Sequence, residues 1–325
     1  MSPEVAPKPK LPALLVLETE DPLVREVIRF LLEAGYPILG MGQSEKSLGA
    51  LKSKPNFQFQ KIDLSRQDIL RSYLYEIDFV LFLDRNEDLI NRLEHTYRSL
   101  EHLKSKPPGF LFLSSSEVFS SYDPGENLED SPRTPVTQRG LNYASAEEMV
   151  ANYSVHTQGR ACIVRIPPVW DPALTDDRLA NISRILRLNK PLSNLEEGTF
   201  CLQWVQLKDL ASTIITLLES HWSGTEIMHC YSYSGSLVDS LLEIAEIMGS
   251  GSGTKDLKAI PQFLRKTVAQ SPTLKEKIES FMGWESLDFL RAAPLGMKQT
   301  LRLFPEPSLK ISTFLNQFPR TKKRR

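Results

Sequence analysis

LPALLVLETEDPLVREVIRFLLEAGYPILGM, residues 11–41, is the part of this sequence that says most about its fold. Its apolar run at 14–17 predicts a buried strand. Asp21 is the predicted N-cap of the following helix, and Pro22 is its first residue, where a missing N–H costs nothing. Gly35 ends that helix and a second apolar strand begins after it, so the stretch predicts a strand–helix–strand unit.

The turn between the first strand and the helix reads Leu17-Glu18-Thr19-Glu20-Asp21 and contains no glycine. In units of this kind that hold a dinucleotide, glycines let the backbone approach the pyrophosphate, which faces the helix N-terminus. Three carboxylates stand here instead, and one like-charge pair at about 4 Å costs roughly 4 kcal/mol at an effective dielectric constant of about 20. The sequence therefore predicts the scaffold of a nucleotide site with its phosphate-binding chemistry replaced.

The composition is typical of a globular protein, with 325 residues, 41% hydrophobic content, 24% charged content and a net charge of −1. No apolar run approaches the roughly 20 residues needed to span a bilayer. The three cysteines, Cys162, Cys201 and Cys230, are far apart, which favours buried thiols in a reducing compartment over a disulfide framework or a zinc site. We expect a cytoplasmic protein with no metal, no membrane contact and no specific nucleic-acid partner.

Apolar strands alternate with amphipathic helices through the first half of the chain, which predicts a parallel sheet covered on both faces. The expected fold class is α/β, a Rossmann-like doubly wound parallel sheet with a smaller, mostly helical C-terminal domain. The expected divisions are a disordered tail over 1–10, a Rossmann-like domain over 11–170, a C-terminal domain over 171–318 in which 201–231 returns to the core sheet, and a basic tail over 319–325. Further expected elements are a strand over 204–207 and helices over 87–104, 142–157, 178–188 and 236–248.

Four segments, in order along the chain, carry a resemblance to a known family. They are Ser114-Ser115-Ser116-Glu117-Val118-Phe119, Asn142-Tyr143, Arg165-Ile166-Pro167-Pro168-Val169-Trp170-Asp171-Pro172 and Trp204-Val205-Gln206-Leu207-Lys208-Asp209-Leu210-Ala211. The first resembles Ser-Ser/Thr-x-x-Val-Tyr of the extended short-chain dehydrogenase/reductase family, which contains the NAD-dependent epimerases and dehydratases. The others resemble its Tyr-x-x-x-Lys, Arg-Pro-x-x-Val-Tyr-Gly-Pro and Phe-Val-x-Val-x-Asp-Leu-Ala segments. The resemblance spans roughly residues 11–248, and the shared order of the segments predicts the family's fold.

The resemblance also implies a site. It places catalytic positions at Ser115 and Tyr143, cofactor contacts at Thr19, Asp63 and Leu83, and a substrate cleft at Glu117, Arg165 and Trp170. In the family, a lysine four residues after the tyrosine lowers its pKa, but Glu147 stands at that spacing here. A carboxylate is expected to raise the tyrosine pKa above its ordinary value of about 10. An alignment shifted by one helical turn matches Glu147 to acidic residues further along the family's helix and also leaves no lysine. The family's ribose-binding acid is missing at 41–43 as well.

Three functions stay open at this point. The favoured one is a degenerate family member, a pseudoenzyme that acts as a binding, scaffold or regulatory protein. The second is a nucleotide-sugar epimerase, dehydratase or reductase that uses NAD or NADP through an atypical turn. The third is a subunit of a larger complex. The helices over 87–104 and 142–157 occupy positions that often form a dimer interface in the family, so we expect them to contact a second copy or a heteromeric partner.

Overall fold

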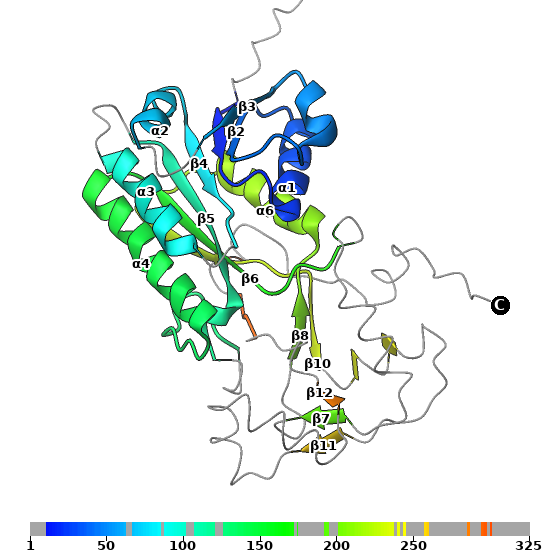
Figure 1. Ribbon diagram of the computed structural model, residues 1–325. Coiled ribbons are helices and arrows are strands. Elements are labelled where there is room, and N and C mark those ends of the chain that lie inside the picture. The colour runs from blue at the N-terminus through cyan, green and yellow to red at the C-terminus, as the bar shows by residue number, and fades with distance from the viewer. Residues whose placement is uncertain are drawn as a thin grey trace, which may run out of the picture.

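The computed structural model describes residues 11–62, 67–85, 88–101, 107–120, 126–171, 174, 192–194, 201–236, 239–240, 243–244, 257–259, 285–286, 294–297 and 300. Within them the chain forms a central parallel sheet between two layers of helices, with two smaller sheets beyond one end of it (Figure 1). The α/β, Rossmann-like fold expected from the sequence is confirmed.

The central sheet has seven strands in the order β3-β2-β1-β4-β5-β6-β9, and every neighbouring pair is parallel. The strands are β1 (Leu14–Val16), β2 (Ile38–Gly42), β3 (Phe57–Lys61), β4 (Phe79–Phe82), β5 (Gly109–Ser115), β6 (Ala161–Ile166) and β9 (Thr225–His229). From β1 the chain adds β2 and β3 on one side of the sheet, and it then returns to add β4 and the later strands on the other side, so the strand order reverses between β1 and β4. This is the topological switch point, and doubly wound sheets bind their ligands beyond the carboxyl ends of the strands at this place.

Helices cover both faces of the sheet. On one face lie α1 (Pro22–Glu33) and α6 (Leu207–Glu219), and on the other lie α2 (Gln67–Leu74), α3 (Leu89–Glu101) and α4 (Gln138–Thr157) (Figure 1). Successive side chains of a strand point to opposite faces. The apolar run of β1 therefore supplies both layers of the core, with Leu14 and Val16 in the layer of α1 and Leu15 in the layer of α3.

Capping side chains set the helix starts. The predicted N-cap of α1 is confirmed, because the Leu23 N–H donates to Asp21 Oδ1 at 2.7 Å. The predicted start of α4 at 142 is wrong by one turn. Thr137 Oγ1 accepts a hydrogen bond from the Gly140 N–H at 2.9 Å, and this cap begins the helix at Gln138. Of the helix expected over 87–104, residue 87 and residues 102–104 lie outside the described residues.

Short strands beyond the central sheet were not all expected. β8 (Cys201–Trp204) pairs antiparallel with β10 (Tyr233–Ser236), and β7 (Leu192–Asn194) lies between β11 (Leu257–Ala259) and β12 (Glu285–Ser286). The strand expected over 204–207 shares only residue 204 with the observed strand β8, and α6 already begins at Leu207. The helix expected over 178–188 lies outside the described residues. Of the helix expected over 236–248, residue 236 ends strand β10, residues 239, 240, 243 and 244 are helical, and the others lie outside the described residues. Two short 3₁₀ turns, η1 (Gly49–Ser53) and η2 (Ser116–Val118), complete the elements. In the described part of the chain, no helix has the length and apolar character that crossing a membrane requires.

Candidate functional site

The turn after β1 adopts the backbone shape of a glycine without containing one. Glu18 has φ of 59°, in the left-handed region that disfavours residues with a β-carbon. The N-terminus of the following helix already has a carboxylate beside it. Asp21 accepts a hydrogen bond from the backbone of the first turn, and it also accepts one from Arg85 Nη2 at 3.1 Å. The turn thus supplies its own negative charge where a pyrophosphate would lie.

Glu18 itself points into the protein. Its side chain is only 8% exposed and pairs with Arg92 of α3, which also contacts Asp84 at 3.4 Å just beyond β4. Burial raises the pKa of Glu18 to about 7, because the lowering effect of Arg92 does not compensate for the loss of water. The ion pair therefore ties the β1–α1 turn to the start of α3 across the switch point.

Glu20 fills the place beside the end of β2. Its carboxylate accepts a hydrogen bond from the Ser44 N–H at 2.5 Å, and a β-carbon built on Gly42 would lie 2.3 Å from Glu20 Oε2. The sequence has no acid directly after β2, but the fold brings this one there from the preceding turn. The Glu20 carboxylate, however, is hydrogen-bonded to the backbone of the following loop and does not line an open ribose site.

Of the three predicted cofactor-binding residues, two are buried and one lies outside the described residues. Thr19 and Leu83 are fully buried, and the methyl group of Thr19 faces Gly40. Asp63 lies outside the described residues. Because the Glu18, Glu20 and Asp21 carboxylates occupy the turn, the residues present do not fit the pyrophosphate of NAD or NADP.

Of the two predicted catalytic residues, Ser115 is the last residue of β5 and Tyr143 lies in the second turn of α4. Tyr143 is 2% exposed and packs against Phe112, and the Arg139 guanidinium lies 5.7 Å from the centre of its ring. Burial raises the pKa of Tyr143, although Arg139 and Arg85 act to lower it. Ser115 Oγ accepts a hydrogen bond from the backbone N–H two residues later, at 3.2 Å, and so caps η2.

Glu147 does not act on Tyr143 as expected. Its carboxylate turns to β6, where it accepts from Arg165 Nε at 2.9 Å and Nη2 at 2.8 Å and from Ser114 Oγ at 2.6 Å. Glu117 is the carboxylate that acts to raise the pKa of Tyr143. Because α4 begins at Gln138, Arg139 and Tyr143 lie one turn apart near the start of the same helix.

The predicted substrate-cleft residues separate into two groups. Arg165 is 2% exposed and ion-paired, and Trp170 is 3% exposed and stacked on Trp204 at 4.8 Å, so both are core residues. Glu117 stays partly exposed and contacts Arg139 at 3.5 Å and Thr137 Oγ1 at 3.3 Å. Sequence reasoning missed Arg139 and Arg92. No local sequence pattern identifies either residue, because Arg92 contacts Glu18 and Arg139 contacts Glu117, each in another element.

A second polar cluster joins the C-terminal residues to the sheet. His229 Nδ1 lies 2.7 Å from the carbonyl oxygen of Gly296, and Thr300 donates its N–H and its hydroxyl to Glu129 Oε1, both at 2.8 Å. His229 is fully buried, and this burial lowers its pKa to about 4. No group of three or more His, Cys, Asp or Glu residues in the described ranges could hold a metal ion.

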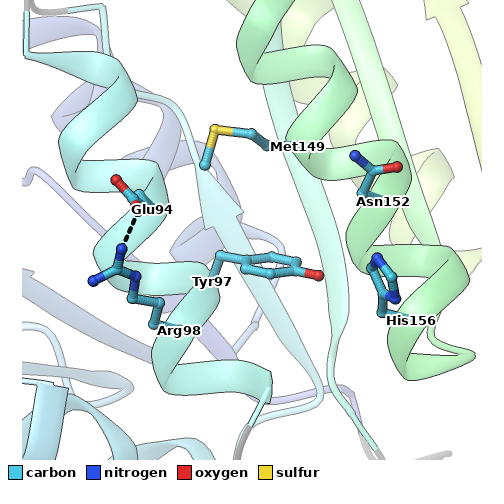
Figure 2. A pocket seen from close by; sticks show the side chains of 6 residues that line it. All are labelled: Glu94, Tyr97, Arg98, Met149, Asn152 and His156. Atoms are coloured by element: carbon cyan, nitrogen blue, oxygen red, sulfur yellow. Dashed lines mark hydrogen bonds and ion pairs between the residues drawn. The ribbon is translucent and has the colours of Figure 1, made fainter.

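A groove of about 430 Å³ lies between α3 and α4 (Figure 2). Figure 2 shows the Tyr97 ring reaching from α3 toward α4. The lining residues are Glu94, Tyr97 and Arg98 of α3 and Met149, Asn152 and His156 of α4. Glu94 and Arg98 form an ion pair on the outer side of α3.

Comparisons with known proteins agree with this fold. The model of the NAD dependent epimerase/dehydratase family matches residues 25–229, so the acidic turn lies just before the match. A dTDP-glucose 4,6-dehydratase from Bacillus anthracis str. Ames, in complex with NAD, has a TM-score of 0.69 at 16% identity over 94% of both chains. A UDP-glucuronic acid 4-epimerase from Bacillus cereus, in complex with NAD, has a TM-score of 0.66 at 18% identity over 94% of this chain and 97% of the other. A UDP-glucose 4-epimerase from Thermotoga maritima, with UDP-glucose, has a TM-score of 0.67 at 13% identity over 94% and 96%. A search of curated proteins found no match.

Proposed function

The chain belongs to the NAD-dependent epimerase/dehydratase family, and on that premise we propose that it is a degenerate member, a binding or scaffold protein without ordinary redox catalysis. The observation that carries the proposal is the ion pair between Arg92 of α3 and Glu18, which lies in the turn where the pyrophosphate would bind. A phosphate entering this turn would meet the Glu18 and Glu20 carboxylates. Each contact near 4 Å would cost roughly 4 kcal/mol at an effective dielectric constant of about 20.

The residues at the catalytic helix support the same proposal. A tyrosine acts as an acid/base when its hydroxyl reaches the substrate and a nearby cation lowers its pKa. Tyr143 is buried, its pKa is raised, and the guanidinium of Arg139 lies over its ring. Neither alignment of α4 supplies a tyrosine with a lysine one turn later.

The experiment is a calorimetric titration with NAD, NADH, NADP and NADPH at low and moderate salt. We expect no heat of binding at millimolar cofactor. The charge-neutral double variant Glu18→Gln/Glu20→Gln should bind better than the native chain, because it removes two repulsions. Glu45→Gln is the matched control, since Glu45 pairs with Lys52 on the surface and should leave the titration unchanged.

One-to-one binding of native protein at micromolar affinity would overturn the proposal. The alternative would then lead: an NAD- or NADP-dependent nucleotide-sugar epimerase, dehydratase or reductase. It draws support from the similar structures, a dTDP-glucose dehydratase and two UDP-sugar epimerases. Its test is cofactor-dependent turnover of nucleotide sugars that Tyr143→Phe or Ser115→Ala abolishes.

We further propose that the partner of this scaffold is a second copy, bound through α3 and α4. Glu94 and Arg98 carry opposite charges on one face of α3, so a two-fold contact would set each against its opposite on the other copy. Val155 of α4 is 73% exposed, which leaves an apolar side chain for such a contact.

Light scattering after size exclusion tests this partner. We expect a dimer for native protein and a monomer for Val155→Glu. Tyr75→Ser removes another exposed apolar side chain, directly after α2, and should leave the dimer intact. A native monomer at high micromolar concentration would contradict the second copy.

A further inference from the structure

Two arginines lie near the same tyrosine at the switch-point edge of the sheet. Tyr143 of α4 packs on Phe112 of β5, which pairs with Phe82 of β4, so the tyrosine lies over these two strands. Arg139, in the first turn of α4, places its guanidinium 5.7 Å from the centre of the Tyr143 ring. Arg85 follows β4, and its charge joins that of Arg139 in acting to lower the Tyr143 pKa. Two guanidinium groups therefore surround one phenol beyond the carboxyl ends of β4 and β5.

Neither guanidinium is saturated by its carboxylate partner. Arg85 donates to both oxygens of Asp21 through a single nitrogen, Nη2, at 3.1 and 3.3 Å, and its buried Nε has no hydrogen-bond partner among the described residues. Arg139 Nε lies 3.5 Å from Glu117 Oε1, which is longer than a charge-assisted hydrogen bond of about 2.7–2.9 Å. The two arginine side chains are 32% and 54% exposed. Because a guanidinium has five N–H donors, both arginines keep donors for a further acceptor that arrives from solvent.

Tyr143 adds a donor of the same kind. Burial keeps its pKa above the ordinary value of about 10, so the phenol is protonated at neutral pH. Its oxygen faces the Arg139 guanidinium as an acceptor, which leaves its proton to donate. A ligand at this place meets two cations and a phenol proton, and it therefore needs acceptor oxygens and negative charge. Planar guanidinium groups match the oxygens of carboxylates and phosphates.

The carboxylates around the β1–α1 turn do not close this place. Glu18 and Asp84 are both paired with Arg92, and Glu20 accepts from the Ser44 N–H beyond β2. In the strand order, β2 is separated from β5 by β1 and β4, which sets the two about 14 Å apart at a strand spacing of about 4.8 Å. Exposed charges more than about 10 Å apart are largely screened at ordinary salt. Repulsion of a phosphate beside β1 and β2 is therefore compatible with attraction of an anion over β4 and β5.

We propose that Arg85 and Arg139 form an anion-binding site beside Tyr143, for a small molecule that carries a carboxylate or phosphate group. This rests on the proposed function, because it names the class of ligand that the switch point would hold in place of a dinucleotide. Tyr143 then serves as a hydrogen-bond donor to the ligand and has no acid/base role. Glu117 competes with the ligand for Arg139 and is displaced from it on binding.

NMR of the full chain with ¹⁵N-labelled arginine tests the site, with sodium phosphate and sodium acetate as probes at low, constant ionic strength. The Nε–H signal of Arg85 should shift along a curve that saturates. The signal of Arg29, on the surface of α1, should not follow this curve. Phosphate saturating at the lower concentration would assign a phosphate group to the ligand, and acetate saturating at an equal or lower concentration would assign a carboxylate.

Variants of the charged residues make the test specific, read from backbone amide signals of α4. Arg85→Gln and Arg139→Gln should each weaken binding about tenfold or more, since each removes a charge-assisted hydrogen bond. Arg29→Gln is the matched control and should leave the affinity unchanged. Glu117→Gln should tighten binding about fivefold, because it removes the carboxylate that competes for Arg139. Glu148→Gln removes an exposed carboxylate further along α4 and should have no such effect.

No saturation by either anion in native protein would overturn the site, and this result does not depend on any variant folding. Equal affinities in native protein, Arg85→Gln and Arg139→Gln would overturn it as well. The cofactor titration separates this site from the proposed function. An anion site that fails while NAD still does not bind leaves the scaffold function standing, whereas micromolar binding of NAD removes the proposed function even where the anion titration succeeds.

Discussion

The buried ion pair between Glu147 of α4 and Arg165 of β6 allows the most demanding test of how this core is held together. Both side chains are 2% exposed, and two parallel hydrogen bonds of 2.8 and 2.9 Å join them. Removing one partner of a buried pair leaves the other as an uncompensated charge, which typically costs about 3–5 kcal/mol. Replacing both by apolar residues of similar volume is often close to neutral.

The two single variants should differ. Arg165→Met leaves Glu147 with the Ser114 hydroxyl and with Arg133 at 3.7 Å, so we expect a loss of about 3 kcal/mol in the free energy of unfolding. Glu147→Met leaves Arg165 with a carbonyl oxygen of Glu129 at 3.2 Å, so the loss should approach about 5 kcal/mol. The double variant should lose clearly less than the sum, with a coupling of about 3 kcal/mol.

Urea unfolding at neutral pH, followed by circular dichroism and tryptophan fluorescence, measures these losses where both signals coincide. Glu148→Met is the control. Its carboxylate is 66% exposed and pairs with Arg133 at 2.9 Å, so its loss should stay below about 1 kcal/mol. Single variants no worse than this control, or a double variant equal to their sum, would refute the reasoning.

Three further predictions follow from the same structure. His229→Gln should flatten the acid limb of stability. In native protein the His229 contribution is present above pH 6.5 and is lost as the pH falls toward 4, by up to roughly 3 kcal/mol, which urea midpoints at several pH values would measure. Gly140→Ala should destabilise by about 1–3 kcal/mol in thermal melts, because the new β-carbon would lie 2.2 Å from the backbone oxygen of Glu117. Asp21→Ala should cost about 0.5–2 kcal/mol in urea unfolding through the lost cap of α1, and unchanged stability would contradict that role.

His229 and Glu18 act on the pH dependence of stability in opposite directions. Stability from Glu18 falls as the pH rises toward 7, and stability from His229 rises over nearly the same range, from about 4 to 6.5. The two dependences oppose each other in the global free energy of unfolding.

Much of the fold could be predicted because its signals are local. Strands β1 and β4 are continuous apolar runs, buried on both faces, and α1 carries its own cap at Asp21. The strands β7, β11 and β12 have two or three residues each, too few to show a two-residue period. Their pairing depends on neighbours distant in the chain.

The site was harder to predict than the fold. The missing glycines and the three carboxylates of the turn are visible in the sequence, and the structure supports what they suggest about phosphate. Sequence spacing set Glu147 beside Tyr143, but the helix turns that carboxylate toward Arg165, far along the chain. Arg92 contacts Glu18 and Arg139 contacts Glu117, each in another element, and no local pattern identifies either arginine.

The positive φ of Glu18 has a consequence for how this turn can change through mutation. Every codon for glutamate or aspartate becomes a glycine codon through one A-to-G transition at its second base. Glu18, Glu20 and Asp21 are therefore each a single nucleotide away from glycine, and at Glu18 the main chain already has the torsion that glycine adopts without strain. The genetic distance between this acidic turn and a glycine-rich one is three point mutations, and the first of them requires no rearrangement of the backbone.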